Sequence, residues 1–197
     1  MKGVTLATLG AGAISTLLGE VPPERGVLLL VAFLAVVITY SGATIGQTIV
    51  HFHPSAIDIA LPMALTVAEL AVVGLPGFDR SPAQIPETWI LTLGIWQILA
   101  ALVVLSVAHR LRPGLYEPGA WRAVSRYRER QYSDVRAAGI GGMATLAYWG
   151  VTHTALNATS ASDWICVLGV ATLLLAGIHN HGITRRELKS TLLPSIG

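Results

Sequence analysis

Glu69 is the side chain of this sequence best placed for chemistry, because its carboxyl group stands inside a long apolar stretch. Ionisable residues within a membrane span are costly and are by default a functional-site hypothesis. Counted along helices at about 1.5 Å per residue, His153 reaches a similar depth in the outer half of a bilayer, and Gln97 and Trp96 reach a somewhat deeper level from outside. These four groups predict one polar vestibule, in which Glu69 and His153 exchange a proton or receive an anion.

A path through a membrane needs further polar groups, and one apolar stretch supplies Tyr40, Thr44 and Gln47, which extend the predicted path inward. The alternative for Glu69 is a protonated or hydrogen-bonded link to a neighbouring helix. The alternative for His153 is a satisfied packing residue.

A second group of side chains consists of five histidines at the ends of apolar stretches: His51, His53, His109, His179 and His181. Neutral imidazole is the commonest metal ligand, and two histidines on facing helices can hold a haem. Each His-x-His pair, however, points its rings about 200° apart on a helix, so only one member faces a common centre. Histidine is also favourable at the negative end of a helix dipole. These histidines therefore remain weak metal candidates, and no cofactor is expected.

The elements that must position these groups are six apolar stretches, each near the length of about 20 residues that a bilayer requires. They cover residues 3–20, 27–50, 55–75, 88–109, 137–157 and 163–183. They predict an all-α, polytopic membrane protein with a single transmembrane domain over 1–197. The first stretch is short, and a cleaved signal peptide is the alternative for it.

The basic residues predict the orientation of these spans. Eleven of the 13 Lys and Arg residues fall on one side of the six spans, and only Arg25 and Arg80 fall on the other. Short loops rich in Lys and Arg stay cytoplasmic. The pattern predicts both termini in the cytoplasm of a cell whose inner (plasma) membrane holds the chain.

In the basic loop 110–136 the chain restarts at Pro118-Gly119, and an amphipathic pattern runs from Ala120 onward. Trp121, Val124 and Tyr127 recur near helical spacing with arginines between them, which predicts an interfacial helix with its aromatic residues toward lipid. The alternative is an Arg-rich, solvated connector. Trp89 and Trp164 are expected at the outer headgroup level, and Asp163 is expected as a helix N-cap.

Composition excludes several other classes. Only 12% of the residues are charged, against about 25% in soluble domains, and the net charge of +2 is no nucleic-acid signal. The single cysteine, Cys166, excludes a disulfide within the chain. Neither Gly-x-Ser-x-Gly nor His-Glu-x-x-His is present, so no enzyme is expected.

Two motifs resemble the acetate uptake transporter (YaaH) family. Leu93-Gly94-Ile95-Trp96 is similar to that family's Leu-Gly-x-Trp, and the ending Ser190–Gly197 is similar to its polar lead into Thr-Val-Leu-Pro and glycine. The family's Asn-Pro-Ala-Pro-Leu-Gly is absent here, and Pro62–Thr66 replaces its Tyr-Gly-x-Phe-Trp. The resemblance implies six spans, proton-linked passage of acetate or a similar small carboxylate, and a ring of subunits.

The sequence thus predicts a small-solute transporter or channel, with lipids, a small-molecule substrate, and copies of itself or other membrane subunits as partners. Three alternatives stay open: a non-catalytic membrane subunit of a larger complex, a haem- or metal-binding redox subunit, and the substrate-binding subunit of a vitamin importer.

Overall fold

The computed structural model describes residues 23–49, 56–78, 87–154 and 160–192, and every regular element in these ranges is helical. The expectation of an all-α fold is confirmed. The elements are α2 (Pro23–Ile49), α3 (Ala56–Phe78), α4 (Glu87–Arg110), the short 3-10 helix η1 (Pro113–Leu115), α5 (Pro118–Thr154) and α6 (Ser160–Leu192).

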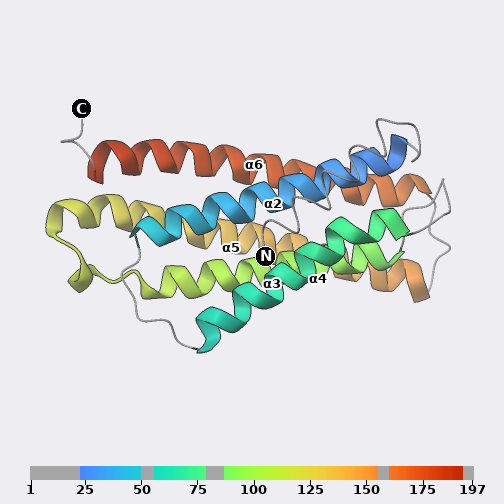
Figure 1. Ribbon diagram of the computed structural model, residues 1–197, viewed down its shortest axis with the longest axis horizontal. Coiled ribbons are helices and arrows are strands. Elements are labelled where there is room, and N and C mark those ends of the chain that lie inside the picture. Colours follow the sequence, from blue (N-terminus) through green and yellow to red (C-terminus); the bar gives the residue numbers. More distant parts are fainter. Residues whose placement is uncertain (1–22, 50–55, 79–86, 155–159, 193–197) are drawn as a thin grey trace.

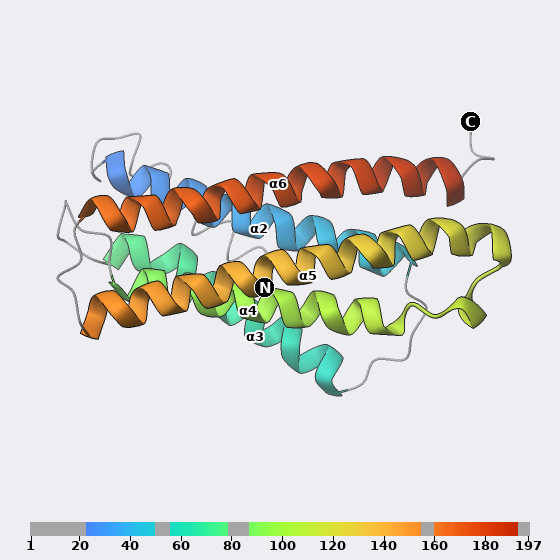
Figure 2. The same cartoon turned by 180° about the vertical axis from the view of Figure 1, so that it is seen from behind.

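The five long helices lie side by side in an elongated bundle (Figures 1 and 2). Helices α2, α4 and α6 run in one direction along the bundle, and α3 and α5 run in the other. The first half of α5 and the last turns of α6 continue together beyond the end of α4, at the left of Figure 1. We call these two segments, 118–136 of α5 and 181–192 of α6, the α5–α6 extension.

Three helices of the described part are long and apolar enough to cross a membrane: Glu24–Gly42 in α2, Thr88–Arg110 in α4 and Ala161–Leu188 in α6. Ile59–Gly74 in α3 forms a shorter apolar helix. About 20 apolar residues suffice for the hydrocarbon core of a bilayer. The helices therefore suggest a membrane protein.

The distribution of side chains fits a lipid environment. Large apolar residues are exposed along α2 to α6, among them Leu30, Val67, Ile140, Ile165 and Leu168. Several polar side chains are instead buried, among them Glu69, Gln97 and Thr145. A soluble protein places these two kinds of residue the other way round.

The main core forms where α2, α3, α4 and α6 meet, and Trp89, Leu93 and Trp96 of α4 are almost completely buried in it. Trp89 Nε1 donates a hydrogen bond of 2.8 Å to the carbonyl oxygen of Val72 in α3. The Trp89 indole, near the start of α4, therefore joins two helices, and its position at the headgroup level stays a prediction.

Small residues allow α4 and α5 to approach closely. A Cβ atom on Gly94 would lie 2.8 Å from Leu146 Cδ2, and one on Gly142 would lie 2.9 Å from Ile98 Cδ1. Such contacts are shorter than packed carbon atoms tolerate. Glycine at these two positions is therefore a packing requirement.

The basic loop differs from its expected structure. A helix begins at Pro118, two residues before the predicted amphipathic pattern, and continues without a break to Thr154. Val124 and Tyr127 pack with Leu111 and with Leu188 of α6 in a small second core, so Tyr127 contacts protein and not lipid. Asp163 also differs, because it is the fourth residue of α6 and its Oδ1 accepts a 2.6 Å hydrogen bond from the Tyr148 hydroxyl.

Candidate functional site

Glu69 lies inside the bundle and is 1% exposed. The Thr39 hydroxyl of α2 donates a hydrogen bond to Glu69 Oε1, so this carboxyl group joins α3 to α2. An ionised carboxylate only accepts hydrogen bonds, and a protonated one also donates. The hydrogen bond between Thr39 and Glu69 therefore depends on which of the two groups supplies the proton.

The Thr39 hydroxyl can form a hydrogen bond with Glu69 in both protonation states of the carboxyl group. Thr39 Oγ1 also lies 3.0 Å from the carbonyl oxygens of Ala35 and Val36. When the hydroxyl turns to one of these carbonyls, Oγ1 accepts a hydrogen bond from a protonated Glu69. When the hydroxyl turns to Glu69, it donates a hydrogen bond to the ionised carboxylate. Thr39 thus keeps Glu69 hydrogen-bonded whether or not it holds a proton.

Trp96, another residue of the predicted vestibule, is also buried, at 2% exposure. No acceptor for Trp96 Nε1 is found in the described part of the chain. Leaving a buried donor unsatisfied costs about 1–3 kcal/mol. The core therefore holds an indole N–H that an additional acceptor would satisfy.

The antiparallel packing of α3 and α4 relates the levels of Glu69 and Trp96. The hydrogen bond from Trp89 to Val72 places these two residues at about the same height along the bundle axis. Glu69 is three residues from Val72, and Trp96 is seven residues from Trp89. At about 1.5 Å per residue, their levels differ by about 6 Å along the bundle. The carboxyl group and the unsatisfied N–H therefore belong to the same part of the core.

Gln97 contacts α5. Its Oε1 accepts a 3.4 Å hydrogen bond from Thr145 Oγ1, which also lies 2.8 Å from the Gly141 carbonyl oxygen. The structure thus joins Gln97 to Thr145 at the α4–α5 contact and Glu69 to Thr39 at the α2–α3 contact. Thr39 and Thr145 were missed from sequence, because a threonine in an apolar helix usually bonds only its own backbone.

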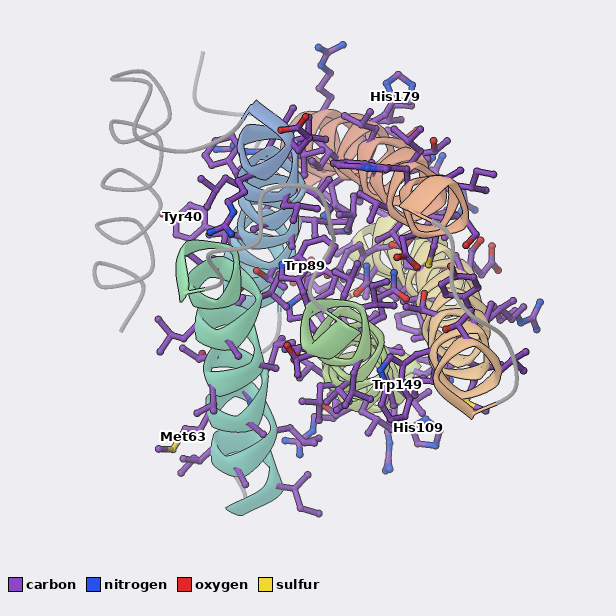
Figure 3. The ribbon with its side chains drawn as sticks, turned by 90° about the vertical axis from the view of Figure 1, so that its right-hand side faces the viewer. Tyr40, Met63, Trp89, His109, Trp149 and His179 are labelled. Atoms are coloured by element: carbon purple, nitrogen blue, oxygen red, sulfur yellow. The ribbon has the colours of Figure 1, made fainter. Side chains whose placement is uncertain are left out.

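Of the other residues of the predicted path, the structure describes the side chain of Tyr40 alone. Tyr40 is 62% exposed on the outside of α2, as Figure 3 shows. Thr44 and Gln47 belong to the helical backbone of α2, and His153 belongs to that of α5, but their side chains lie outside the described ones. The structure therefore leaves their part in a path a prediction.

The structure adds a cluster that the sequence did not predict, formed by His181 of α6, Ser41 of α2 and Asp134 of α5. His181 is 8% exposed. Its Nδ1 lies 2.8 Å from Ser41 Oγ, and its Nε2 lies 3.5 Å from Asp134 Oδ2. Asp134 falls within the stretch 110–136, which the sequence predicts as a basic loop. No sequence signal links these three positions, since their contact depends on the phases of three helices.

Ser41 acts on His181 much as Thr39 acts on Glu69. Ser41 Oγ also lies 2.9 Å from the Ile38 carbonyl oxygen. If Ser41 donates to that carbonyl, both ring nitrogens of His181 face acceptors, which suits the protonated imidazole. If Ser41 donates to Nδ1, the neutral ring carries its proton on Nε2, which faces the Asp134 carboxylate at 3.5 Å. His181 is therefore hydrogen-bonded in either state.

The remaining histidines give no metal centre among the described residues, where no group of three potential ligands occurs. His179 and His109 are exposed on α6 and α4, away from each other in Figure 3. His179 and His181 face different surroundings, as the helical spacing predicts. His51 and His53 lie outside the described residues.

No family model, curated protein or solved structure matches the chain. The resemblance to the acetate uptake transporter family therefore remains an expectation from two short motifs.

Proposed function

We propose that the chain is a six-span protein of the plasma membrane, with both termini in the cytoplasm, that carries acetate or a similar small carboxylate across the bilayer together with a proton. The alternating directions of α2 to α6 support this topology. The arginines of the α5–α6 extension lie at one end of the bundle, as a cytoplasmic side requires.

The observation that carries the proposal is the buried, unsatisfied N–H of Trp96. A carboxylate oxygen is a strong acceptor for such a donor, and hydrogen bonds to charged groups are about twice as strong as neutral ones. A carboxylate that reaches this level of the core would restore the missing bond.

Glu69 supports the link to protons. Because Thr39 can serve it in both protonation states, Glu69 can take up or release a proton without losing its hydrogen bond. A carboxylate accompanied by a proton crosses an apolar core at a much lower cost than the bare anion. His181, with Ser41, is a second group of this kind at another level of α2.

Uptake of labelled acetate into proteoliposomes under an imposed pH gradient tests the proposal. The parent protein should accumulate acetate when the gradient is present. Trp96→Phe keeps an aromatic ring but removes the donor, and it should raise the KM about tenfold. Glu69→Gln should abolish the dependence on the gradient. The exposed carboxylate Glu129 provides the control, and Glu129→Gln should behave as the parent does.

Topology is tested separately by labelling single cysteines in a Cys166→Ala background. A cysteine at Arg122 should react only with a cytoplasmic reagent, and one at Asp79 only with an external reagent. The reverse pattern would overturn the proposed orientation.

A second function is favoured by the tight burial of Glu69, Trp96 and Gln97 against neighbouring helices. This packing also suits a non-catalytic membrane subunit of a larger complex. Folded protein that shows no uptake above empty liposomes, and that purifies from its native membrane with other subunits in fixed proportion, would establish this function in place of transport.

A further inference from the structure

A small pocket lies within the α5–α6 extension. Its lining includes Arg126, Tyr127 and Arg130 of α5, and Thr184, Glu187 and Leu188 of α6. The candidate membrane span of α6 extends to Leu188 and carries Arg185, Arg186 and Glu187 in its last turn, and that of α4 ends at Arg110, close to the second core around Leu111. The pocket is therefore at the level where phospholipid headgroups meet the ends of membrane helices.

The charges of this pocket do not cancel. Arg130 donates from Nη2 to Glu187 Oε1 at 2.8 Å and from Nη1 to Thr184 Oγ1 at 2.9 Å, so it neutralises the carboxylate. Arg126 donates from Nε to the Arg122 carbonyl oxygen at 3.3 Å. It has no carboxylate partner among the described residues. The pocket thus retains the positive charge of Arg126.

Tyr127 adds an unused hydrogen-bond donor. This residue is almost completely buried, and no partner for its hydroxyl is found in the described part of the chain. Burial, followed by the charge of Asp134, raises the pKa of Tyr127, so the hydroxyl keeps its proton at neutral pH. A buried donor without an acceptor is costly, and an anion in the pocket would supply the acceptor.

The free volume of the pocket is about 10 Å³, which is room for one water-sized group. We infer that one phosphate oxygen of an anionic phospholipid from the adjoining membrane leaflet occupies this pocket, with Arg126 supplying the charge and Tyr127 a hydrogen bond. Basic pockets between helices at this level suit such headgroups. Leu173 of α6 is 44% exposed and lies about three helical turns before Thr184 on the same face of the helix, so it provides apolar surface for an acyl chain. A lipid uses both features, whereas free phosphate uses only the pocket.

The inference depends on the membrane placement of α4 and α6, but not on the transport of any solute. Its test uses the full chain in dodecyl maltoside with added phosphatidylglycerol, phosphatidylcholine or inorganic phosphate. Bound lipid is counted by native mass spectrometry, and the unfolding temperature is measured in parallel.

Phosphatidylglycerol should bind and raise the unfolding temperature more than phosphatidylcholine does. Arg126→Gln should weaken its binding about tenfold, since a charge-assisted hydrogen bond is lost. Tyr127→Phe should weaken binding about threefold. It should leave the lipid-free unfolding temperature unchanged or higher, because it removes an unsatisfied buried hydroxyl. Arg185→Gln is the matched control, since Arg185 is exposed beside Thr184 but does not line the pocket.

Three results would overturn the inference. Equal binding of the two lipids would remove the requirement for an anion. If Arg126→Gln and Arg185→Gln weakened lipid binding equally, the lipid would be responding to the overall positive charge of this surface and not to the pocket. If inorganic phosphate stabilised the parent as strongly as phosphatidylglycerol does, and Arg126→Gln removed that effect, the pocket would bind a soluble phosphate and not a lipid.

Discussion

The main core and the α5–α6 extension are built from the same helices but are held together differently. The main core packs aromatic and aliphatic side chains of four helices around Trp89, Leu93 and Trp96. The extension has a small apolar cluster that includes Tyr127, supplemented by the contacts of Arg130 with Glu187 and Thr184 and of His181 with Asp134. Apolar burial supplies most of the stability of packed helices, and exposed ion pairs supply little.

This comparison also separates two kinds of chemistry. In the main core, a buried carboxyl group and an unsatisfied indole are enclosed by rigid packing. In the extension, charged groups remain partly exposed. The first arrangement suits a site whose protonation and occupancy matter inside a membrane, and the second suits the recognition of a charged group at its surface.

The largest effect should come from Trp89→Ala, which removes a completely buried side chain and leaves the Val72 carbonyl without its side-chain partner. Large-to-small changes of this kind cost about 3–5 kcal/mol. Trp121→Ala in the extension should cost less, because Trp121 is only partly buried. Unfolding in mixed micelles of increasing SDS content measures both. Equal losses would contradict the contrast between the two regions.

Gly94→Leu should cost about 2–3 kcal/mol by forcing α4 away from Leu146 of α5. Gly169→Leu is the control, since a Cβ atom on Gly169 meets no atom within 4 Å. The same unfolding measurement applies. A Gly94 variant as stable as the control would show that the two helices do not require this close approach.

His181→Ala should cost about 1–2 kcal/mol, because Ser41 and Asp134 both lose a partner inside the bundle. His179→Ala, two residues away and exposed, should change the free energy of unfolding by less than about 0.5 kcal/mol. If the two variants were equally stable, the cluster would not join the three helices.

Glu187→Gln should cost less than about 1 kcal/mol, since the Arg130–Glu187 pair is 36% and 43% exposed. High salt should remove the difference between this variant and the parent. A loss that persists in high salt would show that the extension depends on this pair more than its exposure implies.

The smallest effect at neutral pH should come from Tyr127→Phe, and it should change with pH. The pKa of Tyr127 is raised above 10 in the folded chain, chiefly by burial. The protonated phenol of the parent therefore contributes to the free energy of unfolding below pH 10, and this contribution is lost as the pH rises toward the raised pKa. The stability of Tyr127→Phe relative to the parent should increase above pH 10. Unfolding compared at pH 8 and pH 11 tests this sign.

The sequence by itself determined the all-helical class, the apolar stretches of α2, α4 and α6, and the position of Glu69, Trp96 and Gln97 within apolar segments. It could do so because helix formation and apolar length are properties of one continuous segment. A helix start near Pro118 was predictable for the same reason, since proline suits the first turn of a helix.

Only the tertiary structure decided which groups meet. It buried Trp89 against Val72, made α5 one continuous helix packed on α6, and gave His181 its partners Ser41 and Asp134. These contacts depend on the rotation and relative level of neighbouring helices. A shift of one residue turns a side chain by about 100°, so spacing along a single segment does not determine them.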